Sequence, residues 1–101
     1  MNRIILLPKI ISKLEIMGEN IKLARLRRKL SVEQVCERAN ILNETLVNIE
    51  NGSPNVLFGH YVSVLITLNL VNDIYNIAND DILGRKLQDI ELLNNSKNSP
   101  N

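Results

Sequence analysis

The sequence has very little of the chemistry on which small enzymes and small secreted domains depend. It contains one cysteine, one histidine and no tryptophan, so neither an intrachain disulfide nor a cysteine or histidine metal cluster can form. His60, the single histidine, has no sequence neighbour with which to build a triad or a metal site. Because no convergent set of acid, base and nucleophile can be assembled, we expect neither an enzyme nor a bound cofactor or metal.

Aromatic residues are also scarce, at 3% of the chain, so a core must come from Ile, Leu and Val. Apolar residues make up 45% of the 101 positions, which is enough for one domain without disulfides. Pro8 and Lys9 interrupt the apolar run at the N-terminus. That run is too short for a membrane span and lacks a small-residue cleavage site, so we expect a cytoplasmic protein.

The chain as a whole has no large excess of one charge, since its net charge is +1. The distribution is more informative, because a local patch sets the surface potential. Residues 21–30 contain no acid, whereas residues 71–92 are mildly acidic. The basic residues of the first segment are Lys22, Arg25, Arg27, Arg28 and Lys29.

Helical spacing of apolar residues extends through nearly the whole chain, and strand signals are weak. The sequence therefore predicts an all-α fold with a single domain over residues 1–93 and a polar, disordered tail over 94–101. The expected helices are Pro8 to about Lys29, Val32–Ala39, Asn43–Asn51, Leu57–Leu68, Val71–Asn79 and Asp81–Leu92, the last capped by Asp80 or Asp81.

Two short helices joined by a tight turn are the most informative feature. Ser31 and Gln34 have the spacing of a capping box at the start of the first helix. Asn40 is expected in the left-handed conformation, Cys36 is small enough for the helix crossing, and Gly52 ends the second helix. The side chains then left on the outward face of the second helix are Asn43, Glu44, Val47 and Asn48.

Residues 21 to about 70 resemble the lambda-repressor/Cro-like helix-turn-helix superfamily. The resemblance rests on the combined spacing of Leu30-Ser31, Val35, Ala39, Ile41, Leu46 and Ile49-Glu50-x-Gly52. It implies a five-helix DNA-binding domain, here with an extended N-terminal helix, a core over about 21–70 and a C-terminal helical extension over 71–93.

A narrower resemblance, to HipB-type regulators, rests on residues 18–30 and on Gly84-Arg85-Lys86-Leu87-Gln88-Asp89-Ile90-Glu91-Leu92. It implies a bacterial, nucleoid-associated repressor encoded beside a HipA-like kinase toxin. Such a protein would bind a palindromic double-stranded operator as a homodimer.

The superfamily resemblance also implies roles for individual residues. Base contacts fall on Asn43, Glu44, Val47 and Asn48. Contacts to the DNA backbone fall on Lys22, Arg27, Arg28, Lys29, Val32, Thr45 and Asn51. Arg25 is implied to pair with Glu50 across the core rather than to contact DNA.

Several positions depart from the superfamily pattern. Val32 replaces a glutamine that contacts phosphate, Asn40 replaces a turn glycine, and Leu42 replaces a capping Ser or Thr, so that Asn43 would have to cap instead. The loop at residues 53–55 carries no basic residue. These departures keep two alternatives open: a protein-interaction or toxin-neutralising subunit with weak DNA binding of its own, and a stand-alone phage-type repressor.

The C-terminal part holds more apolar residues than one small domain can bury. The leftover face should pair with a second copy or with a co-encoded partner protein.

Overall fold

The structure is a computed structural model that describes residues 3–98. Within this range it contains six α-helices and no strand: α1 (Pro8–Arg27), α2 (Val32–Ala39), α3 (Asn43–Glu50), α4 (Phe58–Thr67), α5 (Asn72–Tyr75) and α6 (Ile82–Asn98). The all-α class expected from the sequence is confirmed. None of these helices combines the length and the apolar character needed to cross a bilayer.

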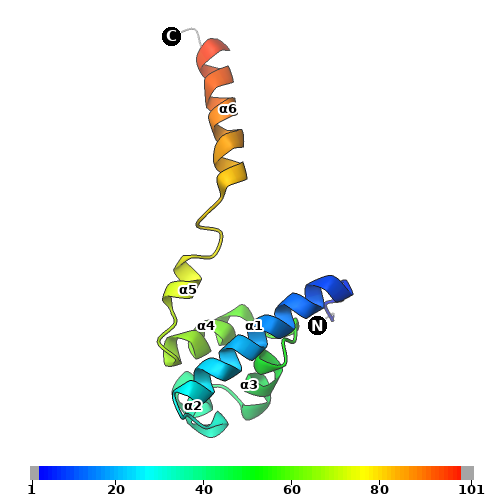
Figure 1. The fold of residues 1–101 in the computed structure, drawn as a ribbon, viewed down its shortest axis with the longest axis vertical. Helices are drawn as coiled ribbons and strands as arrows, with labels where there is room; N and C mark the ends of the chain where they lie inside the picture. Colours follow the sequence, from blue (N-terminus) through cyan, green and yellow to red (C-terminus); the bar gives the residue numbers. More distant parts are fainter. Residues whose placement is uncertain (1–2, 99–101) are drawn as a thin grey trace.

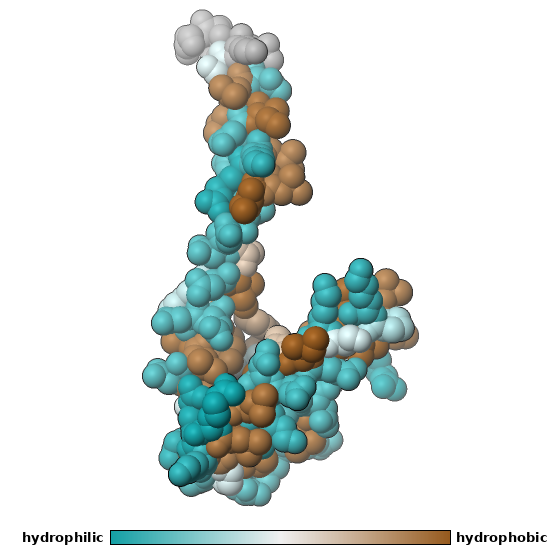
Figure 2. Space-filling model, viewed as in Figure 1, coloured by the Kyte–Doolittle hydropathy of each residue, from teal (hydrophilic) through white to brown (hydrophobic). Residues whose placement is uncertain are grey.

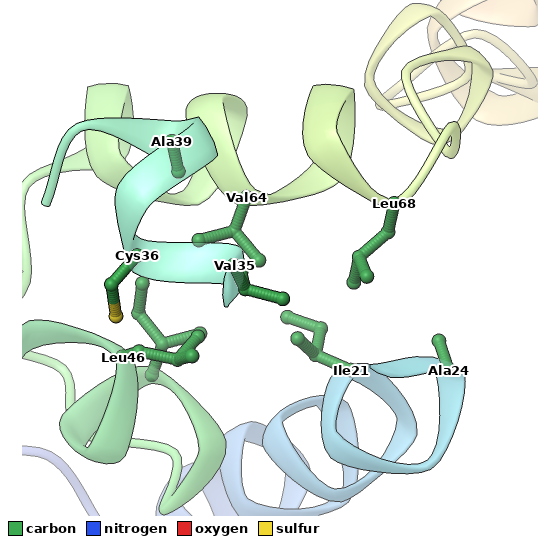
Figure 3. Close-up of a cluster of buried hydrophobic side chains, with 9 residues drawn as sticks. Ile21, Ala24, Val35, Cys36, Ala39, Leu46, Val64 and Leu68 are labelled. Atoms are coloured by element: carbon green, nitrogen blue, oxygen red, sulfur yellow. The ribbon is translucent and has the colours of Figure 1, made fainter. Parts of the chain in front are cut away.

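The first four helices form a bundle, and α1 crosses its face (Figure 1). Helix α1 packs on α3, and α2 packs on both α3 and α4. Ile21 and Ala24 of α1 point toward Val35, Val64 and Leu68 in the bundle interior (Figure 3). The largest fully buried side chains are Leu46, Ile49, Leu68, Val35 and Val64, so aliphatic burial supplies the main stabilisation.

Local signals explain where α2 begins and ends. Gln34 N–H donates to Ser31 Oγ at 3.1 Å, and Ser31 N–H donates to Gln34 Oε1 at 2.8 Å. This is the expected capping box, and it satisfies two backbone donors at the helix start. Asn40 ends the helix in the left-handed conformation, with φ 56° and ψ 50°. Both sequence expectations are confirmed.

Two glycines allow α1 and α3 to approach closely. A Cβ on Gly18 would lie 2.6 Å from the carbonyl oxygens of Ile49 and Glu50. Gly52 has φ +76°, and a Cβ there would lie 2.6 Å from the Glu15 backbone. Since backbone atoms block both positions, the crossing requires glycine on each side.

Several helix boundaries differ from the sequence prediction. Helix α1 ends at Arg27, because Lys29 takes a positive φ of 55°. Helix α5 covers only four residues instead of the longer segment expected, and Ala78 has a φ of 58°. Asn and Asp make up four of the nine residues in the expected helix, and their side chains favour turns over helix interiors.

The expected disordered tail was wrong for residues 94–98, where α6 continues to Asn98. No glycine or proline interrupts the helix there. The rest of the predicted tail, 99–101, lies outside the described residues. Helix α6 points away from the bundle, in a molecule 63 Å long (Figure 1).

Candidate nucleic-acid interface

The turn between α2 and α3 holds the two helices at a fixed crossing. Ile41 N–H donates to the Cys36 carbonyl at 3.1 Å, and Cys36 Sγ donates to the Leu42 carbonyl at 3.6 Å. Cys36 is 4% exposed. Its small side chain therefore fills the contact between the helices, and burial raises the pKa of its thiol.

One face of α3 is turned to solvent while the other is completely covered. Leu46 and Ile49 are 0% exposed, and they hold α3 against the bundle. The four residues implied in base contacts, Asn43, Glu44, Val47 and Asn48, are all exposed. The structure therefore brings these four side chains together on one projecting surface, which we call the α3 face.

Asn43 is free of the capping role considered for it. Leu42 is the N-cap of α3 and makes no side-chain capping bond. Asn43 is the first helical residue and is exposed. Its amide can therefore contact an external partner at the start of the helix.

The basic residues at the end of α1 differ in what else they do. Lys22, Arg27 and Lys29 are exposed. Arg28 is exposed too, but its Nη1 donates to the Ala24 carbonyl at 2.8 Å. Arg28 therefore satisfies a carbonyl at the C-terminus of α1 and complements the helix dipole.

The other residues implied in backbone contact differ in accessibility. Val32 and Thr45 are half-buried, whereas Asn51 is exposed at the end of α3. Val32 packs against the core, so only its backbone can contact a phosphate.

Arg25 lies apart from the exposed basic residues. It is 7% exposed, and its Nε donates to Glu50 Oε2 at 2.7 Å while Nη2 donates to Oε1 at 3.0 Å. Nη1 donates to the Leu30 carbonyl at 3.0 Å. The hydrogen bond that Arg25 donates to the Glu50 carboxylate raises the Arg25 pKa above its usual value. Arg25 thus ties α1 to α3 and is not available to DNA.

The loop after α3 is held by contacts that the sequence did not suggest. Ile4 N–H donates to Asn55 Oδ1 at 2.8 Å, and Tyr61 Oη donates to the Ser53 carbonyl at 3.0 Å. The N-terminal segment therefore lies along this loop. Because Ile4 and Asn55 are far apart in the sequence and the donor is a backbone N–H, no local sequence pattern predicts this hydrogen bond.

The acidic pair after α5 has a structural explanation. Asp81 Oδ1 accepts from Gly84 N–H at 2.9 Å, which caps α6. Asp80 pairs with Arg85 at 2.7 Å on the surface. Elsewhere among residues 3–98, no three His, Cys, Asp or Glu side chains gather as metal ligands would.

Comparison with known proteins does not identify a family, so the functional interpretation depends on the residues described above. The sequence matches no protein-family model, and no match was found among curated proteins.

Proposed function

We propose that this chain is a sequence-specific DNA-binding transcriptional repressor. In this proposal α2 and α3 form a lambda-repressor-like helix-turn-helix, and α3 enters the major groove. The observation that carries it is the α3 face: four exposed side chains on a helix whose opposite side is fixed by fully buried Leu46 and Ile49. A rigid projecting helix of this kind fits a groove about 12 Å wide.

The chemistry of the α3 face suits base edges. An asparagine amide can bond adenine at two points, a carboxylate can accept from cytosine N4, and a valine can contact a thymine methyl. Asn43, Asn48, Glu44 and Val47 supply these groups. Each good contact would discriminate against the wrong base by about 1–3 kcal/mol.

Affinity would come from phosphates, which Lys22, Arg27 and Lys29 can contact with free, exposed side chains. Arg28 would add to this affinity only through the guanidinium N–H groups that do not bond the Ala24 carbonyl. The backbone N–H groups at the start of α2, where the helix dipole is positive, can hold a further phosphate. With so few positive groups, binding by one copy should be weak, and its salt dependence should correspond to only about three phosphate contacts.

Two copies would therefore act together, on a palindromic operator whose half-sites lie about one helical turn apart. The resemblance to HipB-type regulators extends the proposal to a bacterial cytoplasmic setting and to a HipA-like kinase as the co-encoded partner. That partner would bind the dimer and adjust repression.

A second candidate is a protein-interaction or toxin-neutralising subunit that binds DNA only weakly. Glu44 is exposed on the α3 face, and the loop at 53–55 carries no basic group. Both features would weaken the approach to phosphates. A stand-alone phage-type repressor remains a variant of the first candidate, without the co-encoded partner.

The test is selection of duplexes from a random double-stranded pool by the full chain, followed by affinity measurements on the selected site and on a shuffled one. The proposal expects a palindromic consensus and a preference of at least about 10³ for the selected duplex over the shuffled one. A pool that shows no enrichment, with equal weak affinity for both duplexes, would favour the second candidate.

A further inference from the structure

Helix α6 exposes an apolar side to solvent. Apart from Gly84, every residue from Ile82 to Ser96 is exposed. Its large apolar side chains are each between 57% and 69% exposed, although such groups gain about 1.5–3 kcal/mol on burial. Figure 1 shows this helix standing away from the bundle, and Figure 2 shows hydrophobic side chains along it.

The apolar residues of α6 lie mostly on one side. At helical spacing most of them fall within one arc of the helix surface, with Lys86 and Asn94 among them. Leu92 is the exception and lies on the opposite side with Gln88 and Glu91. We call this arc the α6 stripe; its members are Ile82, Leu83, Leu87, Ile90 and Leu93.

A groove of about 560 Å³ lies among the segment before α1, the middle of α1, the loop after α3, α4 and α5. It is apolar along most of its wall, with Leu14 and Met17 from α1, Leu65 from α4 and Ile74 from α5. Asp73 is the acidic residue in its lining. In Figure 2 the surface is hollowed between the projecting end of α1 and the segment of α5.

We infer that α6 of a second copy occupies this groove, and that the two copies exchange their α6 helices reciprocally. The inference shares one element with the proposed function, namely that two copies of the chain form a dimer. It adds which two surfaces form that dimer. It requires no DNA.

Charge and direction both favour this occupant. Lys86 lies within the α6 stripe, and Asp73 lies within the groove wall, so docking can pair the two. Ile77 lines the groove itself, and α6 begins only at Ile82. To enter its own groove, α6 would have to reverse direction within the four residues between Ile77 and Ile82, whereas in the structure it points away from the bundle (Figure 1).

The area is also that of a stable dimer. A helix of 17 residues is about 25 Å long and about 10 Å across. Burying half of its surface removes about 400 Å² from solvent, and the groove wall loses about half that area. Two such contacts bury about 1,200 Å² in total, which is the lower end of the range for a specific interface.

The first experiment measures the mass of the full chain by light scattering, without DNA, for the unmodified protein and two variants. Leu87→Glu places a carboxylate in the α6 stripe, and Gln88→Glu places the same group on the opposite side. The inference expects dimers for the unmodified chain and for Gln88→Glu, and a monomer of unchanged helicity for Leu87→Glu. A monomeric unmodified chain, or a dimer that survives Leu87→Glu, would overturn it.

The second experiment identifies what α6 touches. Leu87→Cys and Ile74→Cys are made in separate chains, mixed and oxidised. A disulfide-linked dimer that needs both variants supports exchange. Linkage of Leu87→Cys with itself would show that two α6 helices pair directly. A third variant carries both substitutions in one chain, and a disulfide that forms only within that chain would show folding back. Either result overturns the inference. A dimer that does not bind DNA would refute the proposed function and leave this inference intact. A monomer that binds a selected site would support DNA binding and overturn this inference.

Discussion

Arg25 and Glu50 form a two-point ion pair that fixes the end of α3 against α1. The Nε–Oε2 distance is 2.7 Å and the Nη2–Oε1 distance is 3.0 Å, and the two side chains are 9% and 7% exposed. A planar guanidinium that bonds both oxygens of one carboxylate sets orientation as well as distance. The pair therefore helps to hold the α3 face in the position from which we propose that it reads DNA.

Removing one partner of this pair should destabilise the fold strongly. Glu50→Ala leaves the Arg25 guanidinium buried without its counter-charge, and we expect a loss of about 3–5 kcal/mol in the free energy of unfolding by urea. Asp80→Ala breaks the exposed pair with Arg85, whose side chains are 61% and 78% exposed, and should cost less than about 1 kcal/mol. Equal losses of unfolding free energy in the two variants would contradict the claim that the buried Arg25–Glu50 pair stabilises the fold more than an exposed pair does.

Gly18→Ala should destabilise the chain although alanine favours helices. The new Cβ would meet the Ile49 and Glu50 carbonyls at 2.6 Å, and overpacking against backbone costs about 1–3 kcal/mol or more. The gain in helix propensity is only about 1 kcal/mol. Gly59→Ala in α4 is the matched control, because a Cβ there meets nothing within 4 Å. Thermal unfolding should show a lower Tm for Gly18→Ala and an unchanged or higher Tm for Gly59→Ala; a higher Tm for Gly18→Ala would refute the close approach.

Alkaline pH should weaken the fold through Cys36. Desolvation raises the pKa of this thiol above its ordinary value of 9.0, so the folded state favours the neutral form. The stabilising contribution is complete below about pH 9 and is lost as the pH rises toward the folded pKa. Burial raises the pKa of Tyr61 as well and adds a similar loss above about pH 10.

The check is the urea midpoint measured at pH 8 and at pH 10 for the natural chain and for Cys36→Ala. The natural chain should lose more stability over this interval than the variant does. In the same samples at pH 8, a thiol reagent should modify Cys36 only after urea unfolds the protein, because the side chain is 4% exposed. Rapid modification of the folded chain would contradict the buried position.

Phosphate contact should depend on which side of α1 a lysine occupies. Lys22→Ala should weaken binding to all duplexes alike and reduce the slope of log affinity against log salt by about 0.9, the value for one phosphate. Lys13 is exposed on the opposite side of the same helix, and Lys13→Ala should leave the slope unchanged. The same slope change in both variants would indicate only a nonspecific charge effect.

The sequence was most informative where structure is determined locally. Ser31 with Gln34, Asn40 and Gly52 each act within a few residues, so α2, its turn and the end of α3 could be predicted closely. The Arg25–Glu50 pair joins two distant helices and came only from the resemblance. The segment around α5 was misjudged because apolar spacing suggested a helix where Asn and Asp favour turns. The bond from Ile4 to Asn55 joins a backbone donor to a distant loop, and no sequence pattern marks it.

The direct test of DNA recognition by α3 is base preference in a variant that removes its two amides. Affinities for the selected duplex and for its single-base variants are measured with Asn43→Ala plus Asn48→Ala, and with the control Asn72→Ala plus Asn95→Ala on exposed positions of α5 and α6. We predict that the first protein stays folded, keeps its salt dependence and loses about 1–3 kcal/mol of discrimination at one or two base positions, while the control keeps the full preference. An unchanged base preference in the first protein would contradict the account.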